Sequence, residues 1–69
     1  MKFSLNGAAY IELIKLLKLL HIAESGGHAK IMVEDGEVTL NGEVEYRKRA
    51  KLRQGDVVKT VGKEILIEV

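Results

Sequence analysis

Apolar residues dominate the stretch 8–20, and the polar residues among them fall at a spacing typical of a helix. These polar residues form one narrow stripe: Glu12, Lys15 and Lys18. Asn6 is a suitable N-cap, so we expect this helix to begin near Gly7 or Ala8 and to end within residues 21–24. Because its apolar arc is wide, we expect neighbours on more than one side of the helix, with a dimer seam as the alternative.

A second, shorter helix is predicted directly after the first. Ser25 is a suitable N-cap, and Gly36 is placed to end the helix in a left-handed conformation. The apolar positions between them are spaced to form one face: Ala29, Met32 and Val33.

The rest of the chain alternates in the manner of strands, over residues 37–40, 43–46, 57–61 and 64–69. The dipeptide Asn41-Gly42 is a strong hairpin signal, and we expect Gly62-Lys63 to be the tight link between the last two strands. Residues 54–56 read as a further turn, and residues 3–5 as a short edge strand.

The first hairpin contains a conflict of register. A strict two-residue turn pairs Leu40 with Glu43, which turns Val38 and Leu40 away from the face of Val44. Either a bulge shifts the register or the strands diverge. We favour divergence, because a run of cations follows at once and cannot be buried. The predicted fold is a single α+β domain over residues 1–69, with two N-terminal helices on one face of a small, mostly antiparallel sheet.

Charge is distributed unevenly. The chain has 11 Lys and Arg against 10 Asp and Glu, a net charge of +1. Five cations nevertheless fall within residues 47–53, here called the basic segment: Arg47, Lys48, Arg49, Lys51 and Arg53. Such a cluster indicates a polyanionic partner. The alternative is a solvated loop whose cations pair with Glu37, Glu43 and Glu45.

Catalytic, metal-binding and membrane-spanning roles have little support in the sequence. There is no cysteine, which excludes disulfides, a thiol nucleophile and cysteine-ligated metals. His21 and His28 are separated by a predicted helix break, and we interpret both as surface or helix-end residues. Residues 8–20 are charged and too short to cross a bilayer. We therefore expect a cytoplasmic protein that is no enzyme and has no cofactor, metal or membrane partner.

Two glycines at the start of the second helix leave its backbone amides uncovered. Together with the helix dipole and Lys30 one turn on, Gly26 and Gly27 could form an anion site; the alternative is a loose helix start without a ligand. Aromatic residues number only one Phe and two Tyr, which argues against a platform for stacking single-stranded bases. Structured RNA, recognised by shape and charge, fits better.

The motifs of residues 25–42 and 52–58, in this order and spacing, resemble the S4 RNA-binding domain. Their shared features are Ser25, an Ala29-Lys30 pair, Asn41-Gly42 and Gly55-Asp56. The chain is more similar still to the small stand-alone bacterial proteins made of this one domain, the YbcJ/YaaA type. Many members carry Arg or Lys directly after the Ser, where this chain has Gly26 and Gly27. The resemblance implies an RNA-binding module whose packing residues include Ala29, Met32, Val33, Val38 and Leu40.

We therefore expect a non-enzymatic domain that binds structured RNA, ribosomal or transfer RNA, with the ribosome as a further partner. Gly26, Gly27, Lys30 and the basic segment should form one phosphate-binding surface, with the segment lying beside the amino end of the second helix. The alternative is a protein–protein interaction module, ribosome-associated or dimeric; a monomer is favoured over a dimer.

Overall fold

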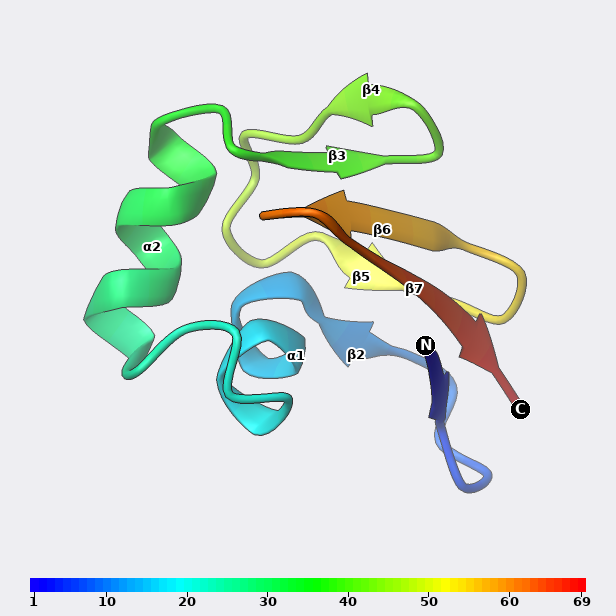
Figure 1. Cartoon of the computed structure of the whole chain (residues 1–69). Helices are drawn as coiled ribbons and strands as arrows, with labels where there is room; N and C mark the ends of the chain where they lie inside the picture. The colour runs from blue at the N-terminus through cyan, green and yellow to red at the C-terminus, as the bar shows by residue number, and fades with distance from the viewer.

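Two helices and seven short strands make up the fold in the computed structural model, which describes all residues, 1–69 (Figure 1). The helices are α1 (Leu13–Leu19) and α2 (Gly26–Glu34). The strands, in chain order, are β1 (Lys2–Ser4), β2 (Ile11–Glu12), β3 (Val38–Leu40), β4 (Glu43–Val44), β5 (Lys51–Leu52), β6 (Val57–Thr60) and β7 (Lys63–Glu68).

Five of the strands form one sheet in the order β1-β7-β6-β3-β4, and the other two pair separately as a β2–β5 ribbon. Every pair is antiparallel except β1 with β7, which is parallel. The predicted α+β architecture and the edge strand near the amino terminus are thereby confirmed. The β2–β5 ribbon was not predicted.

The β3–β4 hairpin settles the register conflict. Asn41 and Gly42 both have positive φ, 51° and 88°, as a two-residue primed turn requires. Leu40 pairs with Glu43 and Thr39 with Val44, and β4 then ends. One further bond joins the strands, from the Glu45 N–H to the Val38 carbonyl at 3.0 Å. Beyond Glu45 the strands diverge, as expected, and the chain enters the basic segment.

The link between β6 and β7 lies one residue earlier than predicted. Thr60 pairs with Lys63, so the turn residues are Val61 and Gly62, with φ of 41° and 75°. The prediction of Gly62-Lys63 was wrong because Lys63 still belongs to the strand ladder. The turn therefore places Val61 in the left-handed conformation, which is unfavourable for a β-branched residue.

The first helix is much shorter than predicted. Asn6 does not cap it; Asn6 and Gly7 form a turn with φ of 51° and 85°. The chain then runs extended into β2, because β2 pairs with β5, and α1 begins only at Leu13. It ends at Leu19, two residues before His21, whose φ is 57°. The predicted apolar face was too wide because it included apolar residues before Leu13, which do not belong to the helix.

The second helix agrees with its prediction at both ends. Ser25 is the N-cap, and its Oγ accepts a hydrogen bond from the His28 backbone N–H at 3.1 Å. Gly36, with φ of 74°, follows the C-cap residue Asp35 in a left-handed conformation.

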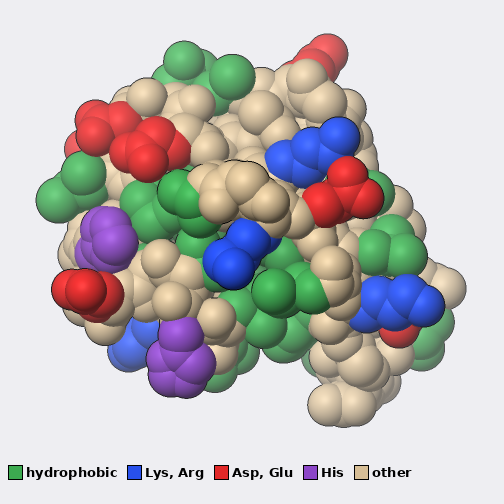
Figure 2. All heavy atoms as spheres, viewed as in Figure 1, with side chains coloured by type: hydrophobic (Ala, Val, Ile, Leu, Met, Phe, Trp, Pro, Cys, Tyr) green, Lys and Arg blue, Asp and Glu red, His purple; other side chains and the backbone are tan.

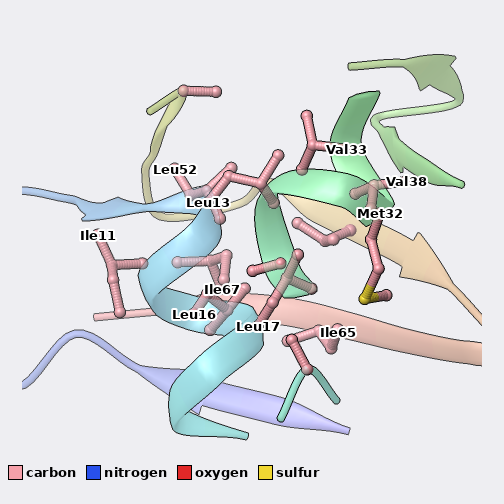
Figure 3. Close-up of a cluster of buried hydrophobic side chains, with 14 of the residues drawn as sticks. Ile11, Leu13, Leu16, Leu17, Met32, Val33, Val38, Leu52, Ile65 and Ile67 are labelled. Atoms are coloured by element: carbon pink, nitrogen blue, oxygen red, sulfur yellow. The ribbon is translucent and has the colours of Figure 1, made fainter. Parts of the chain in front are cut away.

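The core lies between the two helices and the strands (Figure 3). Helix α1 contributes the fully buried Leu13, Leu16 and Leu17. Residues from the other elements pack against them: Met32 and Val33 of α2, Val38 of β3, Leu52 of β5, and Ile65 and Ile67 of β7. Of the expected packing positions, Leu40 is only partly buried. Neither helix has the length and apolar character that a bilayer span demands.

Candidate nucleic-acid interface

The basic segment follows β4 and includes β5, and its first residues run beside α2 (Figure 1). Its main chain is attached to the start of α1. The Leu13 N–H donates to the Ala50 carbonyl at 2.9 Å, and the Ile14 N–H donates to the Lys48 carbonyl at 3.2 Å. Ala50 itself is buried. The cationic side chains therefore project from a backbone that the fold holds in place.

The first two cations of the segment are paired within the chain. The Arg47 guanidinium donates to both carboxylate oxygens of Glu45, at 3.0 and 2.9 Å. This hydrogen bonding lowers the pKa of Glu45 and raises the pKa of Arg47. The Lys48 Nζ lies 2.6 Å from a carboxylate oxygen of Glu34, the last residue of α2.

The last three cations have no acidic partner. Arg49, Lys51 and Arg53 are exposed, and none of them forms an ion pair. The Lys51 ammonium and the Arg53 guanidinium instead lie 5.0 and 5.6 Å from the centre of the Tyr10 ring, which is cation–π distance. These three side chains remain available to an anionic ligand.

The β2–β5 ribbon orients these groups. Ile11 pairs with Leu52, and both are buried. Because side chains alternate along a strand, the flanking residues face outward on the other side of the ribbon. These outward residues are Tyr10, Glu12, Lys51 and Arg53.

Beside the ribbon lies the basic hollow, of about 510 Å³. Its lining consists of four cations and one alanine: Arg47, Arg49, Ala50, Lys51 and Arg53. A concave surface of one charge raises the local concentration of opposite charges. The face in Figure 2 differs: its Lys and Arg side chains stand apart from one another, and some lie beside acidic side chains.

The amino end of α2 holds the other predicted residues. Gly26 and Gly27 form its first turn, and the Lys30 side chain is exposed. Lys48 is held at Glu34, the opposite end of this nine-residue helix, about 12 Å away along its axis. The expectation that the basic segment adjoins the amino end of α2 is therefore not met at Lys48.

Sequence reasoning missed two features of this site. Glu34 is not among the glutamates expected to pair with the basic segment, yet it pairs with Lys48. Of the expected partners Glu37, Glu43 and Glu45, only Glu45 pairs with a cation of the segment. The role of Tyr10 could not be seen because residues 8–12 were expected to be helical, whereas Tyr10 directly precedes β2. Side chains able to bind a metal do not gather in groups of three or more.

Comparisons with known proteins agree on a family. The sequence pattern of the S4 domain matches residues 3–68. YbcJ of Escherichia coli (strain K12), provisionally named an RNA-binding protein, is 42% identical over 65 residues, covering 94% of this chain and 93% of YbcJ. RlbA of Bacillus subtilis (strain 168), provisionally named for ribosome maturation, is 42% identical over 52 residues, 75% of this chain and 73% of RlbA.

The solution structure of YbcJ from E. coli, described as having an αL motif involved in RNA binding, superimposes with a TM-score of 0.75. The two chains are 40% identical in this comparison, which covers 99% of this chain and 86% of the other. Sequence pattern, pairwise identity and architecture thus lead to one assignment. The chain belongs to the S4 domain family.

Proposed function

We propose that this chain is a non-enzymatic domain that binds structured RNA, ribosomal or transfer RNA, in the cytoplasm. The observation that carries the proposal is the set of three cations without acidic partners, Arg49, Lys51 and Arg53, around the basic hollow. Arg and Lys contacts to phosphates provide affinity and orientation without reading the sequence of the nucleic acid. A folded RNA presents phosphates in a fixed arrangement that such a rigid surface can match.

The family supports the same proposal. YbcJ is named for RNA binding and RlbA for ribosome maturation, so a ribosomal RNA or an assembling ribosome is the partner to test first. Binding requires no chemical step, and the cations of the basic segment are suited to holding phosphates.

The alternative of a protein–protein interaction module depended on a first helix with a broad, exposed apolar face, which the structure does not have. The large apolar residues Leu13, Leu16 and Leu17 of α1 are fully buried inside the chain. Of the large apolar residues of α1, Leu19 at the end of the helix is exposed, at 53%. One exposed leucine is ordinary for a protein surface and does not require a partner.

The dependence of affinity on salt tests the proposal. We expect log K for a structured RNA to fall with log salt with a slope of about −2 to −3 if three phosphates are neutralised. Filter binding of a transfer RNA and of a ribosomal RNA fragment over a salt series measures this slope. An affinity that does not change with salt concentration, or no binding at low salt, would overturn the proposal.

The amino end of α2 remains a proposed second part of the surface. A side chain at Gly26 would meet nothing within 4 Å, so this position has room for the Arg or Lys that many S4 domains carry. If RNA passes this end, Gly26→Arg should strengthen binding and steepen the salt slope by about one. Ile31→Arg adds the same charge at an exposed position of the same helix and serves as control. Equal effects of the two substitutions would exclude the amino end of α2 from the RNA-binding surface.

A further inference from the structure

A second hollow, of about 480 Å³, lies between the amino-terminal strand and the β2–β5 ribbon. We call it the apolar hollow. Its walls are mainly hydrophobic and its remaining side chains are one acid and one base: Phe3, Leu5, Tyr10, Ile11, Glu12 and Lys15. Its size is within the roughly 300–1,000 Å³ of pockets that hold small molecules or parts of larger ones. The proposed phosphate contacts do not use it.

The apolar hollow adjoins the unpaired cations through one shared residue. Tyr10 lines the hollow, and the same ring carries Lys51 and Arg53 at 5.0 and 5.6 Å. Lys15 adds a cation to the lining. A phosphate held by Lys51 or Arg53 would therefore lie next to the hollow, and the nucleotide bearing that phosphate could reach into it.

The lining is suited to a nucleobase rather than to a phosphate. An aromatic ring and aliphatic side chains offer surfaces for a flat, weakly polar group, and the stacking of bases on aromatic rings is a common source of RNA affinity. Glu12 forms no ion pair within the chain, so its carboxylate is free to accept hydrogen bonds. A carboxylate repels phosphate but accepts from the amino group of a base, as in contacts to cytosine N4.

We infer that the apolar hollow binds one unpaired nucleobase of the RNA held by the basic segment. This inference rests on the proposed RNA-binding function and adds a preference to it: an RNA with a base free of pairing next to a helical stem. Glu12 adds a preference among bases, because its carboxylate accepts from the amino group of cytosine and repels the O4 acceptor of uracil. Tyr10 supplies the stacking surface.

The test compares two RNAs, a hairpin with an unpaired loop and a blunt duplex with the same number of phosphates. We expect the hairpin to bind more tightly, by roughly 5- to 100-fold, the range that one stacked base provides. Tyr10→Ala should abolish most of this preference, and Tyr10→Phe should retain it. Tyr46→Ala, which removes an exposed tyrosine elsewhere, is the matched control and should leave the preference intact.

A fluorescent adenine analogue in the loop reports the contact directly. Its emission should fall on binding to the unchanged protein and to the Tyr46→Ala variant, but not to the Tyr10→Ala variant. Circular dichroism verifies that the variants remain folded. Because the Tyr10 side chain is partly exposed, at 39%, its removal leaves the core intact.

A second measurement tests Glu12 with loops of cytosine or of uracil. We expect the cytosine loop to bind more tightly, by about tenfold if the acceptor contact provides the lower part of its usual range. Glu12→Gln should reduce this ratio, since an amide both donates and accepts and can pair with either base. An unchanged ratio would show that Glu12 does not read the base.

The outcomes separate the inference from the function on which it rests. Equal, salt-dependent binding of hairpin and duplex, unaffected by Tyr10→Ala, would overturn the base pocket and leave RNA binding in place. Absence of binding to both RNAs at low salt would overturn the proposed function itself. A Tyr10→Ala variant that binds both RNAs as before, but loses a protein partner in a pull-down with purified ribosomal proteins, would assign the hollow to protein contact instead.

Discussion

The two halves of the basic segment have similar residues and different surroundings. Arg47 and Lys48 are paired with Glu45 and Glu34, at 2.9 and 2.6 Å, whereas the side chains of Arg49, Lys51 and Arg53 form no ion pair. The paired half follows β4 and runs beside α2, where acidic side chains lie within reach. The unpaired half continues into the outer face of the β2–β5 ribbon. A run of like charges in a sequence is therefore not one site, because the fold decides which members remain free.

The largest effect should come from removing the unpaired half. Replacing Arg49, Lys51 and Arg53 together with Ala should reduce the salt slope by about three and weaken binding to all structured RNAs alike, since phosphate contacts carry little sequence information. Filter binding over a salt series measures both quantities. The matched control replaces Lys2, Lys59 and Lys63 of the five-stranded sheet, an equal change of charge. Equal losses in the two triple variants would mean that only net charge matters.

A gain of affinity should follow from freeing the paired half. Glu34→Gln and Glu45→Gln each keep the shape of the side chain and release one cation. Together they should steepen the salt slope by about two, since each released cation adds about one phosphate contact. Glu24→Gln with Glu68→Gln removes two other exposed or partly exposed carboxylates and controls for net charge. If both pairs of substitutions act equally, the two halves do not differ in the way the structure indicates.

A smaller effect is expected from pH. The hydrogen bond with Arg47 lowers the pKa of Glu45 in the folded chain, so this pair stabilises the fold above the ordinary Glu pKa of about 4.3. That contribution is lost as the pH falls through the lowered pKa. The unchanged protein should therefore be more stable than Glu45→Gln at neutral pH, with a gap that narrows in acid. Urea unfolding of both proteins over a pH series measures the gap; a gap that widens in acid contradicts the prediction.

The smallest effect concerns the exposed pair of Lys48 and Glu34. Their side chains are 43% and 53% exposed, and pairs of this kind contribute about 0–1 kcal/mol. Lys48→Ala should therefore lower the free energy of unfolding by less than about 1 kcal/mol. Leu17→Ala, in the fully buried core, should cost about 2–5 kcal/mol in the same urea experiment. A large loss of unfolding free energy in Lys48→Ala would contradict the prediction and would show that the pair with Glu34 is important for stability.

Local signals in the sequence predicted much of the fold. The cap at Ser25, the left-handed Gly36 and the Asn41-Gly42 turn are all found in the structure, because each depends on a conformation that few other residues provide. The divergence after the hairpin was predictable too, since the cations that follow could not enter the core.

The errors arise where distant segments decide the structure. Residues 11 and 12 look helical in isolation, yet they form β2 because β5, some forty residues away in the sequence, pairs with them. The same pairing brings Tyr10 to Lys51 and Arg53, so the cation–π contacts could not be predicted from spacing. The ion pair of Lys48 with Glu34 likewise depends on how the segment passes α2. The presence of a basic surface was predictable from the sequence. Which of its cations lack an ion pair was not.

The attachment of the basic segment to α1 has a consequence for how such domains can change. Glu12 gives α1 no side-chain cap; the first N–H groups of the helix are satisfied by the carbonyls of Ala50 and Lys48. Carbonyls are common to all residues, so side chains at the exposed positions of the segment can be exchanged without disturbing the support beneath them. A designer could therefore rewrite the charges of this surface for a new RNA while the scaffold keeps its shape.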